Sequence, residues 1–143
     1  MTFEQNFVTA KLSMIADYLE DAERIFARGY EDVLKNVEKR LATERLCQLL
    51  VDAMLAINHH FIKELNLKVS DDLQGTFYIL GENNILPMDF AKKIVPVVSI
   101  RNRLVHKYEE IDKELFVRSF FKDRDDFKKY VQFINDYMLV HPL

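Results

Sequence analysis

An apolar stripe between Glu31 and Leu65 most constrains how this chain can fold. Its members recur mostly at steps of three and four residues, the spacing of one face of an α-helix. A helix of ~34 residues spans roughly 50 Å, a length suited to an antiparallel hairpin or a subunit interface. The five-residue step from Leu41 to Leu46 rotates the stripe, so we expect a bend or a change of packing partner there. The stripe comprises Val33, Val37, Leu41, Leu46, Leu49, Leu50, Ala53, Ile57, Phe61 and Leu65.

The composition favours an all-α fold built around that helix. The 143 residues include three Gly and three Pro, which leaves few residues for the turns of an all-β fold. Eleven Phe and six Tyr exclude a disordered chain. The length suits a single domain over residues 1–143. We therefore predict an up-and-down bundle of about five helices with a long second helix.

Smaller signals place the ends of the helices around it. A first apolar stripe predicts a helix from about residue 4 to 28, with Gly29 as its stop. Ser70 or Asp71 is suited to cap a short third helix, and Pro87 suits the first turn of a fourth. These signals predict short connections between antiparallel neighbours.

The apolar run from Ile94 to Ile100 is compatible with two kinds of element. Taken alone it can be a buried β-strand, and periodicity does not exclude that alternative. The lack of a second convincing strand favours a helix, and Pro96 then predicts a kink because proline has no backbone N–H to donate. Further on, Asp112 is suited to cap a last helical segment, which acidic residues 123–126 are expected to interrupt.

Charge and cysteine content limit the classes of function. The net charge is −3, so any contact with nucleic acid must depend on a local basic patch. Cys47 is the only cysteine, which excludes an internal disulfide and a zinc site of several thiolates. No signal peptide and no apolar run of membrane-spanning length are visible, so we expect a cytoplasmic protein without membrane contact.

Two polar clusters are weaker candidates for a site. Adjacent helical residues such as His59 and His60 point about 100° apart, so a packed or interface pair is favoured over metal ligands. Basic residues between positions 122 and 129 alternate with acidic ones, which is typical of a solvated helix face. We predict neither a metal site nor a cofactor.

The densest group of titratable side chains lies between Arg101 and Tyr108. On an ideal helix Asn102 and His106 share a face, whereas Arg101 lies about 140° from His106 and aligns with Tyr108. The two ends of this group therefore diverge. Either the helix unwinds after Val105 or a second subunit completes the cleft, and we favour a homodimer.

These residue types suit phosphoryl transfer without a metal ion. Arg101 can stabilise the charge that grows on a phosphorane, and His106 can move protons to and from ribose oxygens of RNA. Asn102 can orient either group, and Arg103 and Lys107 can bind the RNA backbone. The competing interpretation is a structural cap, because basic side chains complement the dipole at a helix C-terminus.

The same residues carry a resemblance to a known family. Arg101, His106 and Tyr108 match the Arg-x4-His-x-Tyr motif, and the chain resembles HepT-like proteins of the HEPN superfamily. The likeness extends over about residues 30–135 and includes the long second helix near residues 45–59.

The resemblance implies a HEPN-like fold and a dimeric, metal-independent ribonuclease toxin of a two-gene toxin–antitoxin module. Arg101 and His106 would be the catalytic pair on an RNA substrate, with Asn102 in support. The partner would be a minimal nucleotidyltransferase (MNT) antitoxin that adenylylates Tyr108. The alternative is a catalytically silent HEPN-type domain that binds nucleotides or acts as an interaction module beside such a nucleotidyltransferase.

Overall fold

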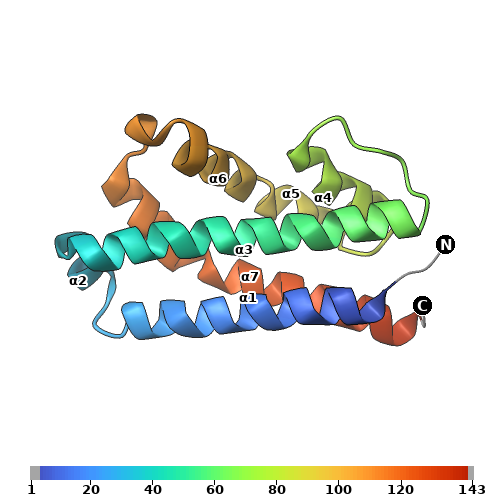
Figure 1. The fold of residues 1–143 in the computed structure, drawn as a ribbon, viewed down its shortest axis with the longest axis horizontal. Helices are drawn as coiled ribbons and strands as arrows, with labels where there is room; N and C mark the ends of the chain where they lie inside the picture. Colours follow the sequence, from blue (N-terminus) through green and yellow to red (C-terminus); the bar gives the residue numbers. More distant parts are fainter. Residues whose placement is uncertain (1–3, 142–143) are drawn as a thin grey trace.

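The computed structural model describes residues 4–141, which form seven α-helices and one 3-10 helix and contain no β-strand (Figure 1). The all-α prediction is confirmed. In chain order the elements are α1 (Gln5–Ile25), α2 (Tyr30–Lys35), α3 (Val37–Glu64), α4 (Leu73–Glu82), α5 (Met88–Ile94), α6 (Pro96–His106), η1 (Tyr108–Glu110) and α7 (Lys113–Val140).

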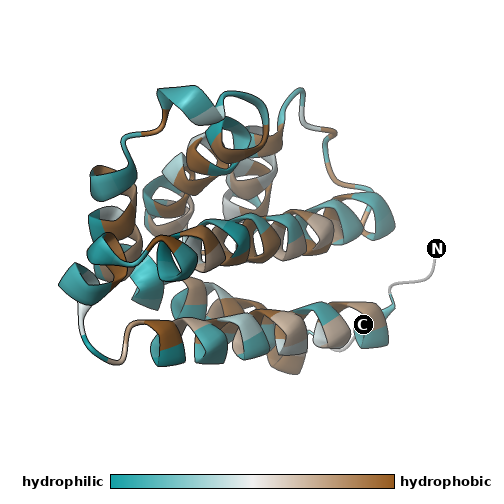
Figure 2. Cartoon of the chain, turned by 60° about the vertical axis from the view of Figure 1, so that its left-hand side comes forward, coloured by the Kyte–Doolittle hydropathy of each residue, from teal (hydrophilic) through white to brown (hydrophobic). Residues whose placement is uncertain are grey.

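The long helix α3 is the centre of an up-and-down arrangement. It runs antiparallel to α1, and α5 and α6 return along its other side before α7 crosses the molecule again (Figure 1). Hydrophobic residues gather on the inward faces of these helices, and hydrophilic residues cover the outside (Figure 2). The predicted first stripe, which consists of Leu12, Ile15, Leu19, Ala22 and Phe26, is buried, and Val8 is buried one turn before it.

The first turns of the long helix differ from the prediction. The helical pattern that begins near Glu31 is divided, because the Asn36 side chain accepts a hydrogen bond from Lys39 N (3.0 Å) and caps a new helix, α3. Leu41 is 48% exposed, whereas Glu44 is 4% exposed. The five-residue step to Leu46 therefore marks the place where a charged residue, not an apolar one, faces the interior.

Other helix ends confirm or correct the predicted caps. Asp72, not Ser70 or Asp71, caps α4 by accepting a hydrogen bond from Gly75 N (2.7 Å). Asp112 caps α7 as predicted and accepts from Leu115 N (3.0 Å).

The predicted interruption at residues 123–126 is wrong, because α7 continues to Val140. Its charged residues are compensated by neighbours across helices. Asp126 lies 3.3 Å from Lys93 Nζ of α5, and Arg124 lies 3.3 Å from Glu23 of α1. The prediction of a fully solvated face is therefore too simple, since part of this charge is used in contacts between helices.

A buried polar network joins three helices beneath this surface. The Tyr130 hydroxyl of α7 donates to Asn58 Oδ1 of α3 (2.6 Å), and Asn58 Nδ2 donates to Thr76 Oγ1 of α4 (3.1 Å). All three side chains belong to residues that are at most 1% exposed. Because each polar group has a partner, the network fixes how α3, α4 and α7 pack.

None of the helices within residues 4–141 combines the length and the apolar character that crossing a bilayer requires.

Candidate functional site

The basic stretch lies at the end of α6, and proline decides where that helix begins. α5 ends at Ile94 and α6 starts at Pro96, so the expected kink is a division into two helices. The helix continues through His106 and ends where Lys107 takes a non-helical conformation (φ −138°, ψ 51°). The alternative in which the helix unwinds after Val105 is therefore wrong. Tyr108 lies in η1, so its predicted helical alignment with Arg101 is wrong as well.

One open cavity of about 570 Å³ surrounds the end of α6. Although Arg101 and His106 diverge around the helix, both line this cavity, so a second subunit is not needed to bring them to one surface. Tyr108 is not among its lining residues. The lining residues are Leu73, Ser99, Arg101, Asn102, Arg103, His106, Lys107 and Glu110.

The guanidinium of Arg101 is held from two sides. Its Nε donates to Asp52 Oδ1 of α3 (2.8 Å), and its Nη1 donates to Asn102 Oδ1 (3.1 Å). The Arg101 side chain is 21% exposed and that of Asp52 is 46% exposed. Two fixed contacts restrict the orientation of a long side chain, which is what an anion-binding arginine requires.

The other predicted site residues are more open to solvent. Arg103, His106 and Lys107 are exposed, and Asn102 is partly buried. Four positions of this cavity thus carry basic side chains, against the single carboxylate of Glu110. The cavity is suited to a polyanion even though the chain as a whole is acidic.

Tyr108 faces a different set of groups, on α3. Its hydroxyl accepts a hydrogen bond from Arg40 Nη1 (3.4 Å), and Arg40 pairs with Glu44 at 3.0 Å. Lys113 Nζ lies 5.5 Å from the centre of the Tyr108 ring. Burial raises the pKa of the Tyr108 hydroxyl, and a hydrogen bond with Glu44 raises it further, while the hydrogen bond from Arg40 acts in the opposite direction.

Sequence reasoning missed Asp52, Arg40 and Glu44. Asp52 is 49 positions from Arg101, and Arg40 is 68 positions from Tyr108, so no local pattern indicates either contact. One signal was available for Glu44. It stands in the five-residue gap of the apolar stripe, at the place where a buried residue is due.

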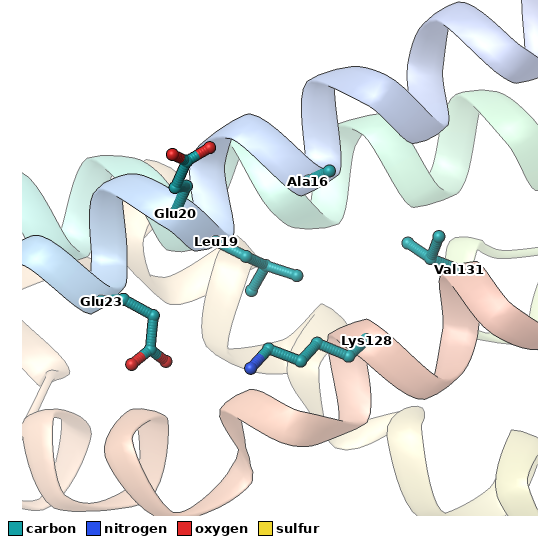
Figure 3. Close-up of a pocket in the computed structure, with 6 residues that line it drawn as sticks. All are labelled: Ala16, Leu19, Glu20, Glu23, Lys128 and Val131. Carbon is teal, nitrogen blue, oxygen red and sulfur yellow. The ribbon is translucent and has the colours of Figure 1, made fainter.

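The remaining candidates do not form a reaction centre. His60 packs as predicted, stacked on Phe7 with ring centroids 4.8 Å apart. In the described part of the chain, no three His, Cys, Asp or Glu side chains are placed to hold a metal ion. A groove of about 360 Å³ between α1 and α7 is mainly apolar around Leu19, with Lys128 reaching toward the Glu23 side (Figure 3).

Comparison with known proteins shows a family match over most of the chain. The profile described as "Ribonuclease HepT-like" matches residues 15–134. A tRNA nuclease HepT of Aphanizomenon flos-aquae (strain 2012/KM1/D3) is 32% identical over 136 residues, which is 95% of this chain and 92% of that protein. An mRNA nuclease HepT of Shewanella oneidensis is 23% identical over 132 residues, with coverage of 90% and 96%.

Solved structures share the same fold. The chain is similar to a tri-AMPylated Shewanella oneidensis HEPN toxin solved in complex with MNT antitoxin, with a TM-score of 0.84 and 17% identity. The alignment covers 93% of this chain and 99% of the toxin chain. The predicted HEPN-like fold is therefore confirmed.

Proposed function

Because this chain belongs to the HepT-like ribonuclease family, we propose that it is a ribonuclease toxin that cleaves RNA in the cavity at the end of α6. The observation that carries this proposal is the position of Arg101, Asn102 and His106 on one cavity of a single chain. The names of the two nucleases to which it is similar support RNA as the substrate.

In the proposed reaction, Arg101 stabilises the negative charge of the phosphorane. Asp52 and Asn102 occupy its Nε and Nη1, and no acceptor within residues 4–141 takes up Nη2, which leaves that group for a phosphate oxygen. His106 takes a proton from the ribose 2′-hydroxyl or gives one to the leaving 5′-oxygen. Arg103 and Lys107 hold the flanking backbone. No step in this scheme uses a metal ion.

The proposal includes a partner and a second copy of the chain. We expect an MNT-type nucleotidyltransferase antitoxin to adenylylate Tyr108. That the similar Shewanella toxin is AMPylated and in complex with an MNT antitoxin supports such a partner. AMP on Tyr108, two residues after His106, adds bulk and negative charge beside the basic cavity and opposes RNA binding. A homodimer would supply two histidines for acid and base.

Cleavage of labelled RNA by the purified protein tests the proposed activity. Arg101→Ala is expected to lower the cleavage rate at least 100-fold, a loss typical of one oxyanion-stabilising donor. Arg124→Ala is the matched control, because Arg124 pairs with Glu23 outside the cavity. If the wild type binds RNA or nucleotide without cleaving RNA, the silent HEPN-type domain is the correct reading.

Intact mass measurement tests the proposed modification. With the partner nucleotidyltransferase and ATP, the wild type should gain AMP and lose cleavage activity, whereas Tyr108→Phe should keep its activity. A Tyr108→Phe variant that is still modified and inhibited would show that another residue is the acceptor.

A further inference from the structure

A buried ion pair on α3 faces the hydroxyl of Tyr108. Arg40 and Glu44 lie 3.0 Å apart, with side chains 14% and 6% exposed. Ion pairs with so little solvent contribute little net stability, because desolvation offsets their attraction, and apolar residues often replace them without loss. The position of this pair against Tyr108 therefore needs a reason other than stability.

The three groups form a compact set around one oxygen atom. Arg40 Nη1 lies 3.4 Å from the phenolic oxygen and also contacts the Glu44 carboxylate. That nitrogen therefore places the Glu44 carboxylate next to the phenol. Burial raises the pKa of the Tyr108 hydroxyl, and the Glu44 carboxylate raises it further, so the phenol keeps its proton at neutral pH and becomes a nucleophile only beside a proton acceptor.

We propose that this chain supplies part of its own modification site, with Glu44 as the base that deprotonates Tyr108 and Arg40 as the cation that holds the transferred phosphoryl group. This inference rests on the proposed adenylylation of Tyr108. The nucleotidyltransferase would supply the nucleoside triphosphate, while α3 of the acceptor chain supplies the base and the cation.

The reaction balances in atoms and charge. The Tyr108 oxygen forms a bond to the α-phosphorus of the triphosphate, the bond from that phosphorus to the bridging β-phosphate oxygen breaks, and pyrophosphate leaves with the electron pair. The phenolic proton passes to the Glu44 carboxylate. Before the reaction Glu44 compensates Arg40, and afterwards the new phosphodiester does, so the buried guanidinium always has one anion beside it.

Proton transfer also explains why the two residues are paired. Once Glu44 is neutral it no longer competes for the guanidinium, which can then turn to the non-bridging oxygens of the diester. The Arg40 contact with the phenolic oxygen already places the cation beside the atom that carries the new phosphate.

The test is the rate of AMP transfer to the full chain by its partner nucleotidyltransferase with ATP, followed by intact mass. We expect Glu44→Gln to slow the transfer at least tenfold while cleavage of RNA by the unmodified variant stays within twofold of wild type. The matched control is Glu114→Gln, which changes another i, i+4 pair with arginine, Arg118–Glu114 on α7. Glu114→Gln should be modified at the wild-type rate.

A double variant addresses the unpaired charge that Glu44→Gln leaves behind. Arg40→Gln with Glu44→Gln removes both charges, so it avoids a lone buried guanidinium, and it should also be modified at least tenfold more slowly. If Glu44→Gln or the double variant is modified at the wild-type rate while RNA cleavage is intact, the inference about Glu44 and Arg40 is wrong, but the proposed modification of Tyr108 stands. A wild type that gains no AMP on Tyr108 would overturn the proposed modification and this inference with it.

Discussion

Replacing Asp52 with asparagine tests whether the contact from α3 holds Arg101 in its working orientation. The carboxylate accepts from Arg101 Nε at 2.8 Å, and asparagine keeps an acceptor oxygen but removes the charge. Because the Asp52 side chain is 46% exposed, the charge-assisted part of this bond contributes about 1 kcal/mol. A loss of about 1 kcal/mol in the transition state corresponds to about a fivefold lower rate.

The assay is single-turnover cleavage of one labelled RNA, with binding measured separately. We expect the cleavage rate of Asp52→Asn to fall about fivefold while RNA binding stays equal or becomes tighter, because a negative charge near the phosphate is gone. Glu20→Gln removes an exposed carboxylate from α1 and should change neither quantity. Faster cleavage by Asp52→Asn would refute the reasoning, since Asp52 would then compete with the phosphate for Arg101.

Two further predictions concern the core. Tyr130→Phe leaves the buried Asn58 Oδ1 without its 2.6 Å hydrogen bond and should lower the free energy of unfolding by about 1–3 kcal/mol in urea denaturation, whereas Tyr78→Phe, at a residue 37% exposed, should change it little. Burial raises the pKa of the Cys47 thiol to about 12, so a thiol reagent at pH 8 should react only after unfolding. Because the unfolded thiol ionises first, near its ordinary pKa of 9.0, stability should also fall as the pH rises from about 9 toward 12.

The features that sequence predicted best are those set by neighbours along the chain. The apolar spacing of α1 and the cap at Asp112 depend on residues within a few positions, and both are confirmed. The basic residues of the cavity are also close together in the sequence, because Arg101 to Lys107 belong to one helix end and its first following residue. Their chemical roles stay predictions.

The features that sequence did not predict depend on packing between helices. Asp52 reaches Arg101 only because α3 and α6 lie side by side. Glu44 is buried beside Arg40, which in turn contacts Tyr108 from a distant part of the chain. The predicted interruption of the helix near Asp126 is wrong because of another contact between helices, in which Lys93 of α5 compensates the Asp126 carboxylate. Local charge patterns do not contain these long-range partners.

The rate of RNA cleavage by His106→Ala tests the central claim most directly. His106 lies exposed on the cavity beside the arginine that would bind the phosphate, so its removal should eliminate the proton transfer while the fold is retained. With EDTA present throughout, the account predicts cleavage by the wild type and a loss of about 100- to 10,000-fold in the variant. Cleavage by His106→Ala at the wild-type rate, or cleavage by the wild type that EDTA abolishes, would contradict it.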